Sequence, residues 1–140
     1  ILSGQPIEIY NHGDMRRDFT YIDDIIEAMM RLIDHIPQAA SDNFETTLSP
    51  ARSSAPYRLY NIGNNNPENL MDFVEILEQL IGKKAEKTML PMQSGDVYET
   101  FADCEDLEEA IGLKPYTPLR DGLSEFLNWY MDYYEISKAA

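Results

Sequence analysis

Apolar residues recur at helical spacing in the segment that follows residue 20. Thr20 and Asp23 have the spacing of a capping box at its start, and Pro37 would stop a helix at its end. The apolar positions that share one helical face are Ile22, Ile25, Ile26, Met29, Leu32, Ile33 and Ile36. The pattern predicts an amphipathic helix from residue 20 to residue 36.

A second helical pattern follows the sequence GNNNP. Asn66 is placed to cap this helix, Pro67 suits its first position, and Gly82 suits its end. Its apolar stripe consists of Leu70, Phe73, Val74, Leu77, Leu80 and Ile81. Two more helices are predicted near the C-terminus, one from Asp103 to Gly112 and one from Thr117-Pro118 through Tyr130.

Short extended segments lie between these helices. Residues 6–10 (PIEIY) and 57–62 (YRLYNI) predict strands, and EKTMLPM (86–92) predicts another. QSGD (93–96) predicts a tight turn that leads into the extended stretch VYETF (97–101). Residues 38–56 are rich in Ser, Thr, Ala and Pro, which predicts a flexible insertion.

The order of these elements favours an α/β or α+β-like unit with few short strands and four or five helices. A length of 140 residues suits one domain, 1–140. An independent doubly wound sheet needs more strands than these. The chain is therefore expected to be a fragment of a longer protein.

Composition limits the classes of ligand. Twenty-five acidic and 11 basic residues give a net charge of −14, which argues against binding to nucleic acid or to anionic membranes. A small anion can still bind beside a single arginine, because distant surface charges are screened. One cysteine (Cys104) and two distant histidines (His12 and His35) form no metal-binding motif, and the chain has no long apolar run, so a cytoplasmic protein without a metal is expected.

The sequence GDMRRDFTYIDD (13–24) contains the strongest candidate for chemistry. Arg16 and Arg17 are either solvated surface charges, or one of them points at a bound anion. Asp23 and Asp24 are interpreted as charges that favour the positive end of a helix dipole rather than as an acid–base pair. The chain contains no GxGxxG or GxxxxGK[ST] loop of its own, so a glycine-rich site for a dinucleotide is not expected within it.

Four segments carry a resemblance to a known family. They are PIEIYNHGDMRRDFTYIDDI, YNIGN, LPMQSGDVYETFAD and GLKPYTPLRDGLSEFLNWY, in this order. Together they resemble the C-terminal, substrate-binding half of extended short-chain dehydrogenase/reductases that act on nucleotide sugars, and the UDP-glucuronate 4-epimerases most of all. In that family an N-terminal Rossmann portion holds NAD and supplies a Tyr-x-x-x-Lys pair. The resemblance therefore implies that catalytic and NAD-binding residues lie outside this chain.

The resemblance also implies substrate-binding residues. Glu8, through its backbone, and Tyr10 correspond to contacts with the uracil ring, and Arg17 corresponds to an arginine that binds the diphosphate. Asp96 corresponds to an acceptor for a ribose hydroxyl, and Gln93 occupies a position at which some relatives carry a second phosphate-binding arginine. Relatives often have Pro where Ser94 and Tyr98 stand, which is a departure from the family pattern.

The implied function is NAD-dependent conversion of UDP-glucuronate to UDP-galacturonate through a 4-keto intermediate, as part of polysaccharide biosynthesis. The isolated chain is expected to be inactive, and the full-length protein is expected to form a homodimer. Two other functions also fit the sequence. The same half of a nucleotide-sugar 4,6-dehydratase or decarboxylase would use the same nucleotide site. An acidic domain without catalytic activity could instead bind a partner protein through the aromatic helix that contains WYMDYY.

Overall fold

The computed structural model describes residues 1–39, 50–114 and 116–136, which separate into two compact units. Unit 1 is assembled from Ile1–Phe19, Asn66–Phe101 and Thr117–Ala140. Unit 2 is assembled from Thr20–Asn65 and Ala102–Tyr116. Each unit therefore combines stretches that are distant in sequence. The expectation of a single domain over residues 1–140 stays a prediction.

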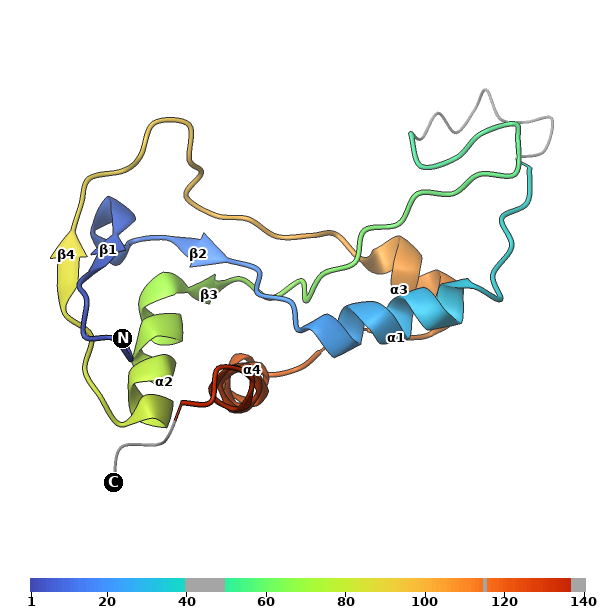
Figure 1. Ribbon diagram of the computed structural model, residues 1–140. Coiled ribbons are helices and arrows are strands. Elements are labelled where there is room, and N and C mark those ends of the chain that lie inside the picture. The colour runs from blue at the N-terminus through green and yellow to red at the C-terminus, as the bar shows by residue number, and fades with distance from the viewer. Residues whose placement is uncertain (40–49, 115, 137–140) are drawn as a thin grey trace. The chain divides into compact units, whose positions relative to one another are not determined.

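Unit 1 contains two short strand pairs (Figure 1). Strand β1 (Ile7–Ile9) pairs in parallel with β4 (Lys87–Met89), and the 3-10 turn η1 (Tyr10–Gly13) follows β1 directly. Strand β2 (Arg16–Arg17) pairs antiparallel with β3 (Glu68–Asn69). The strands predicted within residues 6–10 and 86–92 are confirmed, although each is shorter than predicted and Tyr10 belongs to the turn.

Helices α2 (Leu70–Ile81) and α4 (Leu119–Tyr133) pack against each other in unit 1. Val74, Leu123 and Leu127 are the buried apolar residues of these two helices. The prediction of a helix start at Asn66 and Pro67 is wrong. Glu68 and Asn69 are extended because they pair with β2, so Asn69 is the N-cap and the helix begins at Leu70. The predicted end at Gly82 is confirmed by its left-handed conformation.

A buried carboxylate joins α2 to the segment that leads into β4. Glu78 is only 2% exposed and accepts hydrogen bonds from the Nζ atoms of Lys84 (2.7 Å) and Lys87 and from the backbone N–H of Ala85 (2.9 Å). The bonds from Lys84, Lys87 and Ala85 lower the pKa of Glu78 to about 2. A buried charge that is fully paired in this way fixes the path of the chain after α2.

Unit 2 is built around helices α1 (Ile22–Leu32) and α3 (Glu105–Ile111), which contact each other (Figure 1). Ala28, Leu107 and Ile111 form its buried cluster. Leu32, Tyr60, Ile62, Ala110 and Leu113 pack around that cluster. Unit 2 therefore has an apolar core of its own.

The predicted boundaries of the first helix are wrong at both ends. Tyr21 is extended (φ −78°, ψ 142°) and is the N-cap without a side-chain capping bond, so Thr20 lies outside the helix and forms no capping box. The helix ends at Leu32, short of the predicted residue 36. Asp23 and Asp24 do lie in the first turn of α1, as predicted. α3 likewise begins two residues after the predicted Asp103, with Cys104 as its N-cap.

The prediction of a strand at residues 57–62 is also wrong. Among the described residues of this region, Arg52 and Arg58 form an isolated antiparallel bridge, and the N–H of Leu59 donates to the carbonyl of Ala51 (3.0 Å). A strand needs a partner along its length, and no such partner lies beside 57–62 in the described part of unit 2. Of the predicted insertion 38–56, residues 40–49 lie outside the described residues.

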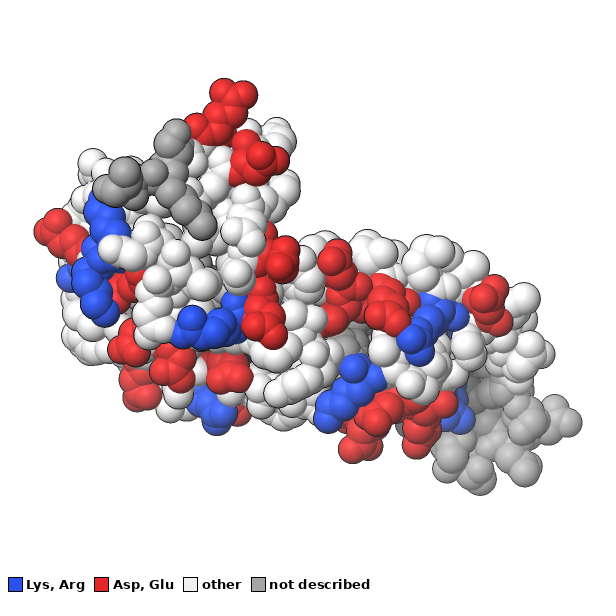
Figure 2. Space-filling view, turned by 90° about the horizontal axis from the view of Figure 1, so that it is seen from below, with Lys and Arg blue, Asp and Glu red and all other residues white. Residues whose placement is uncertain are grey.

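The fold class is confirmed as mixed α/β, with four α-helices and four short strands in the described ranges. In those ranges every helix is too short or too polar to cross a bilayer. On the face drawn in Figure 2, acidic side chains are spread over the surface and the basic side chains lie among them. Any anion site must therefore depend on a local arrangement of donors.

Candidate functional site

A tight connection between β1 and β2 places the two adjacent arginines. Asn11 and His12 have positive φ values (48° and 52°), and Gly13 follows at 85°. The buried side chain of Met15 then fixes the chain where β2 begins. Successive residues of a strand point to opposite faces, so Arg16 and Arg17 are directed to different partners.

Arg17 forms an ion pair with Asp96, which is 79 residues away in the sequence. Nη2 of Arg17 lies 2.8 Å from Oδ1 of Asp96, and Nη1 donates to the carbonyl oxygens of Arg16 (2.8 Å) and Tyr98 (3.0 Å). Within the part of the chain that the structure describes, these three bonds use three of the five guanidinium N–H groups and leave two for a ligand. The side chains of Arg17 and Asp96 are 22% and 35% exposed, so solvent reaches the pair.

Asp96 is presented by the tight turn predicted at residues 93–96. The backbone N–H of Asp96 donates to the carbonyl of Gln93 (3.2 Å), and Gly95 has a φ of 86°. Oδ1 of Asp96 also accepts the N–H of Val97 (2.8 Å). Gln93 therefore contributes its carbonyl to the turn that carries Asp96.

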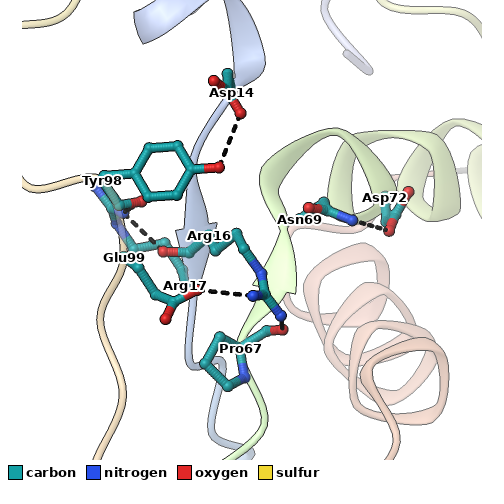
Figure 3. Close-up of polar contacts among 8 residues, drawn as sticks. All are labelled: Asp14, Arg16, Arg17, Pro67, Asn69, Asp72, Tyr98 and Glu99. Carbon is teal, nitrogen blue, oxygen red and sulfur yellow. Dashed lines mark hydrogen bonds and ion pairs between the residues drawn. The ribbon is translucent and has the colours of Figure 1, made fainter.

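Arg16 links β2 to two neighbouring segments (Figure 3). Its Nη1 lies 2.8 Å from Oε2 of Glu99, and its Nη2 donates to the carbonyl of Pro67 (2.7 Å). Its backbone N–H donates to the carbonyl of Tyr98 (2.9 Å). Arg16 thus ties three segments together, whereas Arg17 pairs with a carboxylate that solvent reaches, and a bound anion at Arg17 stays a prediction.

Tyr98 fixes the segment that supplies acceptors to both arginines. Its hydroxyl donates to Oδ1 of Asp14 (3.0 Å) across 84 positions of sequence (Figure 3). This hydrogen bond to the Asp14 carboxylate raises the pKa of Tyr98. The sequence did not mark Tyr98 or Glu99 as parts of the site, and it did not indicate that Arg16 binds Glu99 and the carbonyl of Pro67. Their contacts connect distant segments, and no local pattern of residues marks them.

Glu8 and Tyr10 form a separate pair. The hydroxyl of Tyr10 donates to Oε2 of Glu8 (2.9 Å), and this bond raises the pKa of Tyr10. Among the described residues, no hydrogen bond or ion pair joins either of them to Arg17 or Asp96. The structure therefore brings Arg17 and Asp96 together, and Glu8 and Tyr10 together, as two groups in unit 1.

The described residues do not suit the diphosphate of a dinucleotide cofactor. A helix N-terminus binds phosphate through free N–H groups and its positive dipole. Acidic side chains occupy the first turn of every α-helix in the described ranges: Asp23 and Asp24 in α1, Asp72 in α2, Glu105, Asp106 and Glu108 in α3, and Asp121 in α4. These charges oppose a phosphate there. The same ranges contain no group of three His, Cys, Asp or Glu side chains able to hold a metal ion.

Comparisons with known proteins show what the chain is similar to. The family model described as "NAD dependent epimerase/dehydratase family" matches residues 1–63. An uncharacterized 37.6 kDa protein of Escherichia coli O111:H- is 52% identical over 136 residues, which cover 97% of this chain and 41% of that protein. A "Probable UDP-glucuronate 4-epimerase" of Rhizobium meliloti (strain 1021) is 42% identical over 132 residues, which cover 93% of this chain and 38% of that protein.

A solved structure agrees with these relatives. The crystal structure of a UDP-glucuronic acid 4-epimerase from Bacillus cereus, in complex with UDP-glucuronic acid and NAD, matches 95% of this chain and 37% of that chain, with 25% identity and a TM-score of 0.72. The chain is therefore similar over its first 63 residues to the NAD-dependent epimerase/dehydratase family, and over nearly its whole length to UDP-glucuronate 4-epimerases. It spans about two fifths of the length of these two curated relatives.

Proposed function

We propose that the chain is the nucleotide-sugar-binding part of an NAD-dependent UDP-glucuronate 4-epimerase and corresponds to the C-terminal half of that enzyme. The enzyme would convert UDP-glucuronate to UDP-galacturonate through a 4-keto intermediate. The observation that carries the proposal is the position of Arg17 in an acidic chain, where backbone carbonyls orient its guanidinium and solvent still reaches it. Homology to UDP-glucuronate 4-epimerases supports the choice of substrate.

Arg17 would bind the diphosphate of the UDP-sugar. A guanidinium can donate parallel hydrogen bonds to phosphate oxygens, and charge-assisted bonds of this kind are about twice as strong as neutral ones. The carbonyls of Arg16 and Tyr98 hold the guanidinium before the ligand arrives, which reduces the entropy lost on binding. Binding energy gained at the diphosphate, away from the reacting carbon, then serves to position the sugar.

The other predicted residues would contact the nucleoside. Among the described strands β1 pairs with β4 alone, so its second edge can present backbone donors and acceptors to a uracil ring near Glu8 and Tyr10. Asp96 would accept a hydrogen bond from a ribose hydroxyl, and Gln93 lies in the same turn. No step of hydride transfer is assigned to this chain, because its described residues do not suit the diphosphate of NAD.

The proposal is tested by comparing Arg17→Gln with Arg31→Gln in the full-length protein. Arg31 lies on α1 in an exposed ion pair with Glu27, so its substitution removes the same charge from a surface site. Loss of a charge-assisted bond costs roughly 1.5–3 kcal/mol, so Arg17→Gln should weaken UDP binding about 10- to 150-fold and lower kcat/KM for UDP-glucuronate similarly. Arg31→Gln should change neither. Equal, unaltered affinities in both variants would refute the assignment.

The identity of the product separates the candidate reactions. An epimerase yields UDP-galacturonate, whereas a decarboxylase releases carbon dioxide and a 4,6-dehydratase eliminates water. Proton NMR of the reaction of the full-length protein with UDP-glucuronate and NAD distinguishes these outcomes. The 140-residue chain alone should show no turnover even with NAD added, and activity from this chain would contradict the proposed division of labour.

One observation favours a second candidate function, the binding of a partner protein. Trp129 and Tyr133 on α4 stack on each other with ring centroids 5.4 Å apart, and they are 54% and 66% exposed. Exposed aromatic residues are enriched in protein interfaces. A full-length protein that failed to bind UDP or UDP-glucuronate in calorimetry would favour this candidate over the epimerase.

A further inference from the structure

The ion pair between Arg17 and Asp96 places a carboxylate where the proposed function requires a phosphate. Oδ1 of Asp96 lies 2.8 Å from Nη2 of Arg17 and takes one of its donors. A ligand anion that makes full use of the guanidinium must compete with this internal carboxylate. The negative charge of Asp96 would also repel a diphosphate as long as the pair stays closed.

We propose that Asp96 is a specificity-determining residue, an exchangeable counterion of Arg17 that a diphosphate displaces and a singly charged carboxylate does not. This inference rests on the proposed function of Arg17 as a diphosphate ligand. It adds a second state for Asp96: paired with Arg17 in the free protein, and released to the ribose side when the diphosphate binds.

The two partners are held in ways that suit such an exchange. Arg17 keeps its bonds to the carbonyls of Arg16 and Tyr98 when Asp96 leaves, so the guanidinium stays in position. Asp96 keeps the N–H of Val97 as a donor to its Oδ1, at 2.8 Å, so the released carboxylate is not left without a partner. One member of the pair is therefore fixed, and the other has an alternative donor.

The turn that carries Asp96 has room to move. Gly95 adopts a φ of 86°, and a Cβ built on it would meet no atom within 4 Å. Asp96 is 35% exposed, and residues 91–98 are all exposed. The Arg17 side chain is 22% exposed, so solvent reaches both partners, and breaking the pair should cost little because solvent-exposed pairs contribute about 0–1 kcal/mol.

The selectivity follows from counting charges. Replacing Asp96 by another single carboxylate exchanges one Arg17 ion pair for an equivalent one, so the Coulomb energy gained is small. A diphosphate brings at least two charges and several acceptor oxygens, so it gains more from the same guanidinium. The site would therefore disfavour the uronate carboxylate of the sugar at Arg17 and accept the diphosphate, which fixes the orientation of the substrate.

The test is the Asp96→Asn variant of the full-length protein, which keeps an Oδ1 acceptor for Val97 but removes the charge. Inorganic pyrophosphate, titrated by calorimetry, should bind about two- to fivefold more tightly to Asp96→Asn than to the unsubstituted protein. Acetate should weaken pyrophosphate binding to Asp96→Asn more than chloride does at the same concentration. In the unsubstituted protein the two salts should act alike. Asp96→Ser, which also removes the charge, should shift the pyrophosphate affinity in the same direction.

Controls separate this inference from the proposed function. Glu125→Gln removes an exposed charge from α4, and an equal gain in that variant would show that bulk charge alone is responsible, which would overturn the inference. Unchanged or weaker pyrophosphate binding by Asp96→Asn would overturn it as well. If Arg17→Gln loses pyrophosphate binding in the same experiment, the proposed function stands even though the counterion role fails. If Arg17→Gln binds pyrophosphate normally, the proposed function itself fails.

Discussion

Gly13 offers a sharp test of the packing that positions β2. Its φ is +85°, and a Cβ at this position would lie 2.7 Å from both Cγ and Sδ of Met71. Gly82 is a matched control in the same unit, because its φ is +77° and a Cβ there would meet no atom within 4 Å. Gly13→Ala should therefore combine backbone strain with a steric overlap, whereas Gly82→Ala should show the strain alone.

The magnitudes follow from these two terms. The left-handed region costs a non-glycine residue about 1–2 kcal/mol, which is the expected loss for Gly82→Ala. Overpacking adds about 1–3 kcal/mol, and the flexibility of a methionine side chain favours the lower part of that range. Gly13→Ala should thus lower the free energy of unfolding by about 2–4 kcal/mol.

Urea unfolding followed by circular dichroism measures both losses. Met71→Ala removes the atoms that Cβ would meet, so Gly13→Ala in that background should cost about as much as Gly82→Ala. Equal losses for Gly13→Ala and Gly82→Ala in the original background would refute the steric argument. A loss at Gly13 that persists unchanged without the Met71 side chain would do the same.

Three further outcomes are expected. The pKa of Glu78 is lowered from 4.5 to about 2, so its contribution to stability is complete above pH 4.5 and is lost as the pH falls towards 2. Glu78→Gln should therefore show no loss of stability from this group between these pH values, which acid unfolding followed by circular dichroism measures. Leu107 is fully buried, and Leu107→Ala should lower the urea-derived free energy of unfolding by about 2–5 kcal/mol. Arg16→Lys keeps the charge but cannot reach both Glu99 and the Pro67 carbonyl, so it should destabilise the protein by less than about 1 kcal/mol and weaken UDP binding less than loss of Arg17 does.

The helices could be predicted because their own residues determine them. The apolar stripe of residues 70–81 has helical spacing, and Gly82 marks the end of α2. In the same way, Ile111 and Gly112 mark the end of α3. The first residue of α2 could not be predicted from the neighbouring sequence. Asn66 and Pro67 are a good helix start in isolation, but Glu68 and Asn69 pair with β2 instead. That pairing joins segments about 50 residues apart.

Strands were harder to predict because a strand is stable only with a partner. The segment 57–62 alternates like a strand, yet in the described part of unit 2 Tyr60 and Ile62 pack on the helix cluster instead. The prediction for 86–92 succeeded because β4 finds β1 in the same unit. Pattern alone cannot distinguish these two cases, since the difference lies in which other segments are near.

The candidate site was predictable in its members but not in its contacts. The family motifs singled out Arg17 and Asp96 separately, with roles on different parts of a nucleotide. Their ion pair depends on the turn at 93–96 reaching β2, and the sequence contains no local indication of that approach. The same holds for the bond from Tyr98 to Asp14, which aligns the carbonyl that Arg17 needs.

Because β2 has only two residues, the directions of Arg16 and Arg17 depend on the length of the connection before it as much as on the residues of that connection. Side chains alternate across a strand, so one residue inserted between Gly13 and Arg16 would exchange the directions of the two arginines. Arg16 would then face the 93–96 turn, and Arg17 would turn towards Glu99. A comparison of natural homologues should therefore find substitutions in this connection tolerated more often than changes in its length.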